Sequence, residues 1–138
     1  DWYAISGADR LLHAGAFNWT YTLGTGLMDP WTKGATALIP EPGIASADLP
    51  ELLQKYDATI FAGTPGVYRQ LLNANAKLNL LHLRHGLSAG EKLPPTTAAR
   101  WRAATRCFVY EAYGMSECST FISQSPGSSP KPDVLGKP

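Results

Sequence analysis

The chain has 138 residues, a formal net charge of +1 and 44% apolar residues, enough for one domain with a buried core. This composition argues against disorder, and the near-neutral charge gives no basic footprint for nucleic acid. Since no apolar run approaches the roughly 18 residues of a membrane span, we expect neither a nucleic-acid nor a membrane partner. Two cysteines without a CxxC pair favour a reduced, cytoplasmic compartment.

Short β-like runs alternate with helical patterns along the chain. Strands are expected over 35–39, 58–62, 83–88 and 106–110, and helices over 48–56, from 64–65 onward and over 94–104. Ser46 and Thr64 are expected to cap the first two helices, and Trp101 to face the core. This repetition predicts an α/β fold with a parallel sheet built from βαβ units.

Ligands in such folds bind at the carboxyl ends of the strands, which makes the segments after each strand informative. Residues 63–66, 88–92 and 111–117 are rich in glycine and small residues, and the last two segments carry carboxylates. Aromatic side chains at 17, 19 and 21 would share one face of an extended segment and line an apolar pocket. Taken in isolation, the same aromatic pattern favours ordinary core packing.

The segment 113–117 carries groups that a nucleotide site needs. Gly114 lets the backbone approach a ligand, Ser116 offers a hydroxyl for a phosphate oxygen, and Glu117 offers a hard oxygen ligand for Mg²⁺. Residues 88–92 offer a second close approach and a hydrogen-bonding edge for a purine. Composition alone favours the alternative that both segments are ordinary turns or loops with solvated carboxylates.

Taken together and in this order, these segments resemble the adenylate-forming superfamily of acyl-CoA synthetases, peptide-synthetase adenylation domains and luciferases. The resemblance covers nearly the whole chain and has five landmarks: Tyr113-Gly-Met-Ser-Glu117, which is similar to the family's Tyr-Gly-x-Thr/Ser-Glu motif; Gly90-Glu91, similar to its adenine loop; Trp19 and Tyr21, at the aromatic positions of its acyl pocket; Thr59 and Pro65, as its Thr…Pro pair; and Gly136-Lys137-Pro138.

The resemblance implies an ATP-dependent acid–thiol ligase, which forms an acyl adenylate and then transfers the acyl group to a thiol, usually coenzyme A. Its ligands would be ATP/AMP, Mg²⁺, a small carboxylic acid and CoA, and self-association is left open. By position, Ser116 and Glu117 would be catalytic, with Glu117 holding the metal. The implied nucleotide-binding residues are Gly90, Glu91, Lys92, Glu111, Ala112, Tyr113, Gly114, Met115 and Ser116. The implied acyl-pocket residues are Trp19, Tyr21, Gly24 and Gly114.

The family's phosphate loop, its later ribose-binding Asp and its C-terminal domain have no counterpart in this sequence. We therefore expect residues 1–138 to be an internal part of the N-terminal, AMP-binding domain, inactive alone, with 123–138 as an exposed loop leading toward the remainder. No acid lies between Phe17 and Gly24, which disfavours an amino-acid substrate and favours an aryl or medium-chain acid. A non-catalytic nucleotide- or acyl-binding module and a peptide-synthetase-type adenylation domain stay open as alternatives.

Overall fold

The computed structural model describes residues 3–75, 77–117, 119–127, 129–131 and 133–138. Within them a six-stranded sheet has the order β2-β1-β3-β4-β5-β6. The strands are β1 (Arg10–His13), β2 (Thr36–Leu38), β3 (Ile60–Gly63), β4 (His85–Ser88), β5 (Val109–Met115) and β6 (Ser119–Ser123). Neighbouring strands from β2 to β5 are parallel, and β6 is antiparallel to β5. The predicted α/β class with a mainly parallel sheet is therefore confirmed.

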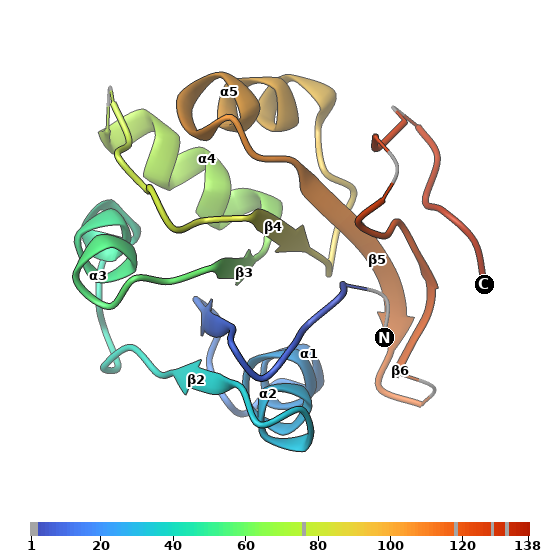
Figure 1. Cartoon of the computed structure of the whole chain (residues 1–138). Helices are drawn as coiled ribbons and strands as arrows, with labels where there is room; N and C mark the ends of the chain where they lie inside the picture. The colour runs from blue at the N-terminus through green and yellow to red at the C-terminus, as the bar shows by residue number, and fades with distance from the viewer. Residues whose placement is uncertain (1–2, 76, 118, 128, 132) are drawn as a thin grey trace.

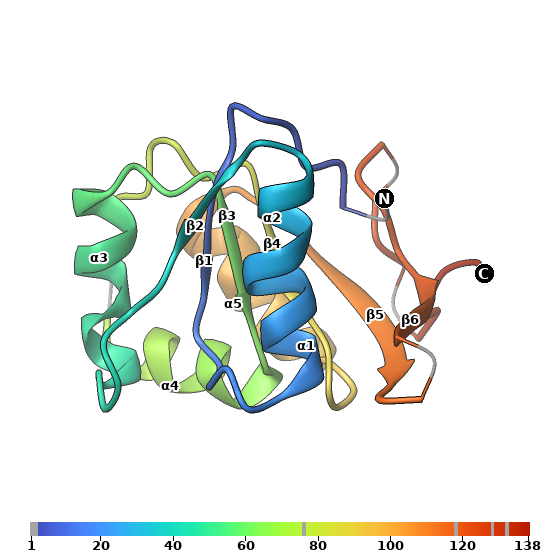
Figure 2. The same ribbon diagram turned by 90° about the horizontal axis from the view of Figure 1, so that it is seen from below.

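Helices cover both faces of the sheet, as Figure 1 shows. On one face lie α3 (Leu49–Lys55), α4 (Pro65–Ala74) and α5 (Pro95–Thr105), with the short 3-10 helix η2 (Ser46–Asp48) leading into α3. On the other face α1 (Thr20–Leu23), the π-helical turn η1 (Gly24–Met28) and α2 (Asp29–Thr32) follow one another without a break. Figure 2 shows α1 and α2 as one column beside the strands. No helix among the described residues is long and apolar enough to cross a membrane.

Alternating side chains divide the core into two clusters, one on each face of the sheet. Leu12 and Phe61 face the cluster beneath α3–α5, whereas their chain neighbours Leu11 and Ile60 face the other cluster. Trp101 of α5 is fully buried and stacks on Phe61 with ring centroids 5.7 Å apart. The predicted inward orientation of Trp101 is confirmed.

The N-terminal ends of α3 and α4 show whether the two predicted helix caps form. The Thr64 hydroxyl accepts a hydrogen bond from the Val67 N–H at 3.4 Å, and Pro65 begins α4, so this cap is confirmed. The Ser46 cap is wrong, because Ser46 lies in η2 and its hydroxyl donates to Gln70 at 2.8 Å instead. The extra 3-10 turn moves the start of α3 beyond the reach of Ser46.

The segment after the fourth predicted strand also differs from expectation. Residues 111–115 continue β5 instead of forming a loop, because β6 returns alongside them and pairs with their backbone. The pairing register shifts between Tyr113 and Gly114, so the ladder is irregular at the glycine. The predicted motif therefore lies mostly on a strand, and only Ser116 and Glu117 lie in the turn that follows.

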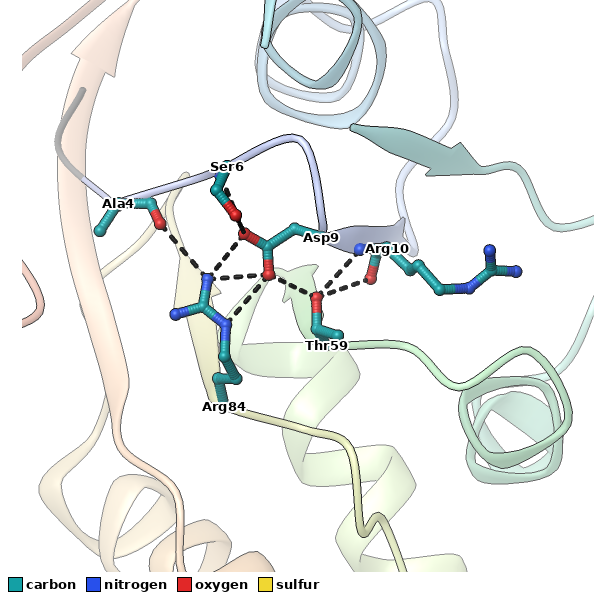
Figure 3. A network of polar contacts seen from close by, with 6 residues as sticks. All are labelled: Ala4, Ser6, Asp9, Arg10, Thr59 and Arg84. Atoms are coloured by element: carbon teal, nitrogen blue, oxygen red, sulfur yellow. Dashed lines mark hydrogen bonds and ion pairs between the residues drawn. The ribbon is translucent and has the colours of Figure 1, made fainter. Parts of the chain in front are cut away.

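A polar network joins the amino ends of three strands, at the end of the sheet opposite to the turn after β5 (Figure 3). Asp9, which precedes β1, is 3% exposed. Its carboxylate accepts hydrogen bonds from the Thr59 hydroxyl before β3 at 2.7 Å and from Arg84 before β4 at 2.8 Å. The backbone N–H and the hydroxyl of Ser6 donate to the same carboxylate. This network fixes the mutual positions of the strands whose other ends carry the candidate site.

Candidate functional site

Two adjoining cavities lie beside the carboxyl end of β4 and along β5. The first, about 370 Å³, is lined by Tyr3, Ile5, Trp19, Thr20, Tyr21, Gly24, Thr25, Asp29, Lys33, Ala89, Gly90, Gly114, Met115 and Ser116. The second, about 390 Å³, is lined by Gly90, Glu91, Lys92, Glu111, Ala112, Tyr113, Gly114, Asp133, Val134 and Leu135. Gly90 and Gly114 line both cavities, so molecules bound in the two would be neighbours.

The wall between the cavities depends on the absence of a side chain at Gly90. Its φ of +95° lies in the left-handed region, and a Cβ there would lie 2.8 Å from Cη2 of Trp19. The Trp19 indole therefore packs directly over the glycine backbone. A larger residue at position 90 would push the indole into the first cavity.

The aromatic wall of the first cavity forms differently from the sequence-based expectation. Trp19 is extended but Tyr21 already belongs to α1, so the expected extended run over 17–21 is wrong. The two rings still meet edge to face with centroids 5.3 Å apart, because the chain turns into the helix between them. Trp19, Tyr21 and Gly24, which the sequence placed together, do line one cavity.

His13 supports this wall from below, at the end of β1. It is fully buried, its ring lies 4.5 Å from that of Tyr21, and its Nδ1 accepts a hydrogen bond from the Gly15 N–H at 3.0 Å. Burial lowers the pKa of His13 to about 3, so the imidazole is neutral at physiological pH. No local pattern predicted this contact, because His13 precedes the aromatic segment.

An acidic side chain lines the first cavity, although none occurs between Phe17 and Gly24. Asp29 begins α2, and its Oδ2 accepts a hydrogen bond from the Tyr3 hydroxyl at 2.8 Å. This bond ties the N-terminal segment to the helix and keeps the carboxylate at the cavity wall. Neither residue was predicted, since Tyr3 and Asp29 are distant in sequence from the motifs.

The predicted catalytic pair lies at the turn after β5. The Ser116 hydroxyl accepts a hydrogen bond from the Thr20 hydroxyl at 3.3 Å, so Ser116 faces the first cavity beside the start of α1. Glu117 is exposed and is absent from the lining of both cavities. In the described part of the chain, no group of three or more His, Cys, Asp or Glu residues could hold a metal ion. A single exposed carboxylate fits Mg²⁺ bound mainly by phosphates and water.

Glu111 joins two walls of the second cavity. Its Oε1 accepts a hydrogen bond from the Leu93 N–H at 2.6 Å, which links β5 to the loop after β4. Burial raises the pKa of the Glu111 carboxyl, and the Leu93 hydrogen bond partly opposes this increase. Lys92, on the same loop, forms an ion pair with Asp133 across the cavity.

The structure separates the predicted residues into two groups. Those expected to bind the nucleotide line the second cavity, namely Gly90, Glu91, Lys92, Glu111, Ala112, Tyr113 and Gly114. Met115 and Ser116 instead line the first cavity with Trp19 and Tyr21, since the register shift at Gly114 divides the motif between the two. Sequence reasoning missed Asp133–Leu135, and its only relevant signal was the Gly-Lys-Pro motif that follows them.

Comparison with known proteins identifies the class. The model of the AMP-binding enzyme family matches residues 1–138, and the chain belongs to this family of adenylate-forming enzymes. It is 30% identical over 139 aligned positions to acyl-coenzyme A synthetase ACSM3, mitochondrial, of Pongo abelii, covering 99% of this chain and 24% of that protein. The chain thus spans about a quarter of the length of the curated relatives it matches.

Solved structures of aryl-CoA ligases have the same fold. The anthranilate CoA ligase AuaEII in complex with anthranoyl-AMP superposes with a TM-score of 0.90 at 27% identity, over 100% of this chain and 27% of that one. A benzoate CoA ligase from Burkholderia xenovorans LB400 gives a TM-score of 0.84 at 29% identity, over 97% of this chain and 28% of that one.

Proposed function

We propose that the full-length protein carrying this chain is an ATP-dependent acid–CoA ligase acting on an aryl or medium-chain carboxylic acid. The observation that carries the proposal is the pair of cavities that share Gly90 and Gly114. An acid in the first cavity and a nucleotide in the second would be neighbours, as attack of the carboxylate on the α-phosphate requires. The acyl adenylate would then transfer its acyl group to the thiol of CoA. Cysteine usage favours the cytoplasm as the compartment.

The lining of each cavity supports this assignment of reactants. Trp19, Tyr21 and Met115 give the first cavity aromatic and apolar walls suited to an aryl or alkyl group. The likeness to anthranilate and benzoate ligases favours an aryl acid. Asp29 adds an acceptor for a hydroxyl or amino substituent.

The residues around the second cavity would hold the nucleotide. Gly90 and Gly114 allow close approach of the backbone, and Tyr113 offers a flat ring for the adenine. Ser116, which lines the adjoining first cavity, offers a hydroxyl to a phosphate. Glu117 would hold Mg²⁺, which acts as a Lewis acid at the phosphates when it is bound. The positioning of the two reactants by these walls would supply much of the rate enhancement.

The test is CoA-dependent AMP release by the full-length protein with a panel of benzoate, 2-aminobenzoate, octanoate and phenylalanine. We expect turnover with at least one of the first three acids and none with phenylalanine. Phenylalanine-dependent pyrophosphate exchange without a CoA requirement would indicate the peptide-synthetase alternative. Binding of AMP without turnover of any acid would indicate the non-catalytic module. We expect no pyrophosphate exchange from the 138-residue chain alone.

Within this assay, Glu117→Ala should raise the KM for Mg·ATP at least about tenfold while the KM for the acid changes little, because only the nucleotide carries the metal. Glu51→Ala is the matched control, since Glu51 is an exposed glutamate on α3 that lines neither cavity. Equal losses for ATP and acid would contradict the metal assignment.

A further inference from the structure

We infer that Gln124 is a positioning residue for the nucleotide, because its buried amide fixes the C-terminal segment formed by Lys131 and Asp133–Leu135 as the outer wall of the second cavity. This inference rests on the proposed function, since it names the part of that same site which sets the width of the nucleotide cavity. Gln124 follows β6 and lines neither cavity, so it would act only through the residues that it holds.

Every polar group of the Gln124 side chain is engaged with backbone. The residue is 8% exposed. Its Oε1 accepts a hydrogen bond from the Glu111 N–H at 3.1 Å. The backbone N–H of Gln124 also donates to the Glu111 carbonyl at 2.8 Å. Its Nε2 donates to the carbonyl of Val134 at 2.6 Å and to that of Lys131 at 3.4 Å. One side chain therefore joins β5 to the C-terminal segment.

These bonds complete a frame around the second cavity. Glu111 lies at the centre of the frame, since its carboxylate holds the loop after β4 through the Leu93 N–H and its backbone holds Gln124. Gln124 in turn holds the segment that contributes Asp133, Val134 and Leu135 to the lining. The side chains of Glu111 and Gln124 thus link the three walls of the second cavity, which are the loop after β4, strand β5 and the C-terminal segment.

The other contacts of the C-terminal segment lie beyond the second cavity or are exposed, so they do not replace Gln124 in holding the cavity wall. Lys137 pairs with Ser123 through two backbone hydrogen bonds of 3.0 and 3.1 Å, which anchor the end of the segment beyond the cavity. Gly136 permits this pairing, because its φ is +107° and a Cβ there would overlap the Ser123 backbone. At the cavity itself, the Lys92–Asp133 ion pair is exposed and contributes little. Among the described contacts, the buried Gln124 amide provides the attachment at Lys131 and Val134.

A nucleotide that contacts Val134 and Leu135 would depend on this attachment. Loss of the Nε2 donors removes the Gln124 hydrogen bonds to the part-buried carbonyls of Val134 and Lys131, which favours movement of the segment toward water. The first cavity shares no residue of this segment, so the binding of the acid should be unaffected.

The test measures the affinity of the full-length protein for AMP by calorimetry, and the KM values for ATP and acid, in Gln124→Ala and Gln124→Glu. The glutamate variant keeps the size of the side chain and the acceptor for the Glu111 N–H but loses the donor to Val134 and Lys131. We expect both variants to weaken AMP binding and raise the KM for ATP roughly tenfold, with the KM for the acid within about twofold of wild type. If the alanine variant does not fold, the glutamate variant supplies the same comparison.

Asn75→Ala is the matched control. The Asn75 amide also donates to two carbonyls, those of Leu71 at 2.9 Å and Ala47 at 3.2 Å, but at the far end of α4 from Thr64. This variant should lose stability without a selective change in nucleotide binding. If wild type binds no AMP, the proposed function fails. If wild type binds AMP and both Gln124 variants bind it equally well, or if the KM values for ATP and acid rise together, the positioning role fails.

Discussion

One hydroxyl group bridges carbonyls of the two central strands, which also pair directly. The Tyr68 hydroxyl on α4 lies 3.0 Å from the carbonyls of both Phe61 in β3 and Leu87 in β4. It occupies the space that a side chain at Gly86 would need, since a Cβ there would overlap it. Burial raises the pKa of Tyr68 well above its usual value, so the hydroxyl remains a donor at every physiological pH.

Tyr68→Phe should lower the free energy of unfolding by about 1 kcal/mol, because both carbonyls lose the hydroxyl as a partner. Gly86→Ala should cost more, about 1–3 kcal/mol, through the clash with that hydroxyl. In the double variant the clash is removed, so the two costs should not add. A double-mutant cycle in urea measures the coupling, and additive costs would contradict this account.

The residue scale also shows where sequence reasoning succeeded. Trp19, Tyr21 and Gly114 were placed in one pocket because the spacing of a motif survives a change in backbone conformation. Tyr3, Asp29 and Gln124 were missed, because each acts through contacts with residues outside its own local segment. Such contacts leave no local pattern.

At the scale of elements, α5 ends in a strained conformation. Its C-cap, Arg106, has φ +64°, in the left-handed region where glycine is favoured, and its N–H donates to the Arg102 carbonyl at 2.8 Å. This turn directs the chain from the helix back into β5. The arginine is exposed, so its side chain can be removed without disturbing the core.

Arg106→Gly should raise the free energy of unfolding by about 0.5 kcal/mol, since relief of the left-handed strain exceeds the entropy that glycine adds to the unfolded chain. Ala103→Gly, at an exposed position inside the same helix, should instead lower it by about 1 kcal/mol. Urea unfolding of the two variants gives the comparison. A loss of stability in both would show that the Arg106 turn is not strained.

Elements with a strong local signal were predicted well, and those defined by pairing were not. Thr64-Pro65 starts α4 because both residues satisfy the helix end on their own. The extension of β5 through Met115 depends on β6, whose return could not be read from the residues of β5. The division of the nucleotide motif between two cavities follows from that pairing, so it was not predictable either.

At the scale of the whole molecule, the Asp9 network connects the strand ends that lie opposite the candidate site. Burial by itself would raise the pKa of Asp9, but hydrogen bonds from Thr59, Ser6 and Arg84 together hold it below the usual value. A carboxyl whose pKa is lowered by folding stabilises the protein above its unfolded pKa of about 3.9. This stabilisation is lost as the pH falls through the lower, folded pKa.

Asp9→Asn should therefore lower the free energy of unfolding by about 2 kcal/mol at pH 7, and the difference from wild type should shrink below about pH 4. Asp57→Asn is the control, because that carboxylate is 64% exposed and lies 3.4 Å from His82. Urea unfolding at several pH values measures both variants. A difference for Asp9→Asn that does not depend on pH would contradict the network as the source.

The place of β1 within the sheet also decides when the polypeptide can fold during its synthesis. β1 is synthesised before the other five described strands, yet it lies between β2 and β3, and the Asp9 carboxylate pairs with Arg84, which is synthesised later. Leu11 and Leu12 therefore lack their β3 partners on the nascent chain until residues beyond 60 have left the ribosome. A pause in translation before that point would prolong the time in which this apolar strand can associate with other chains or be held by a chaperone.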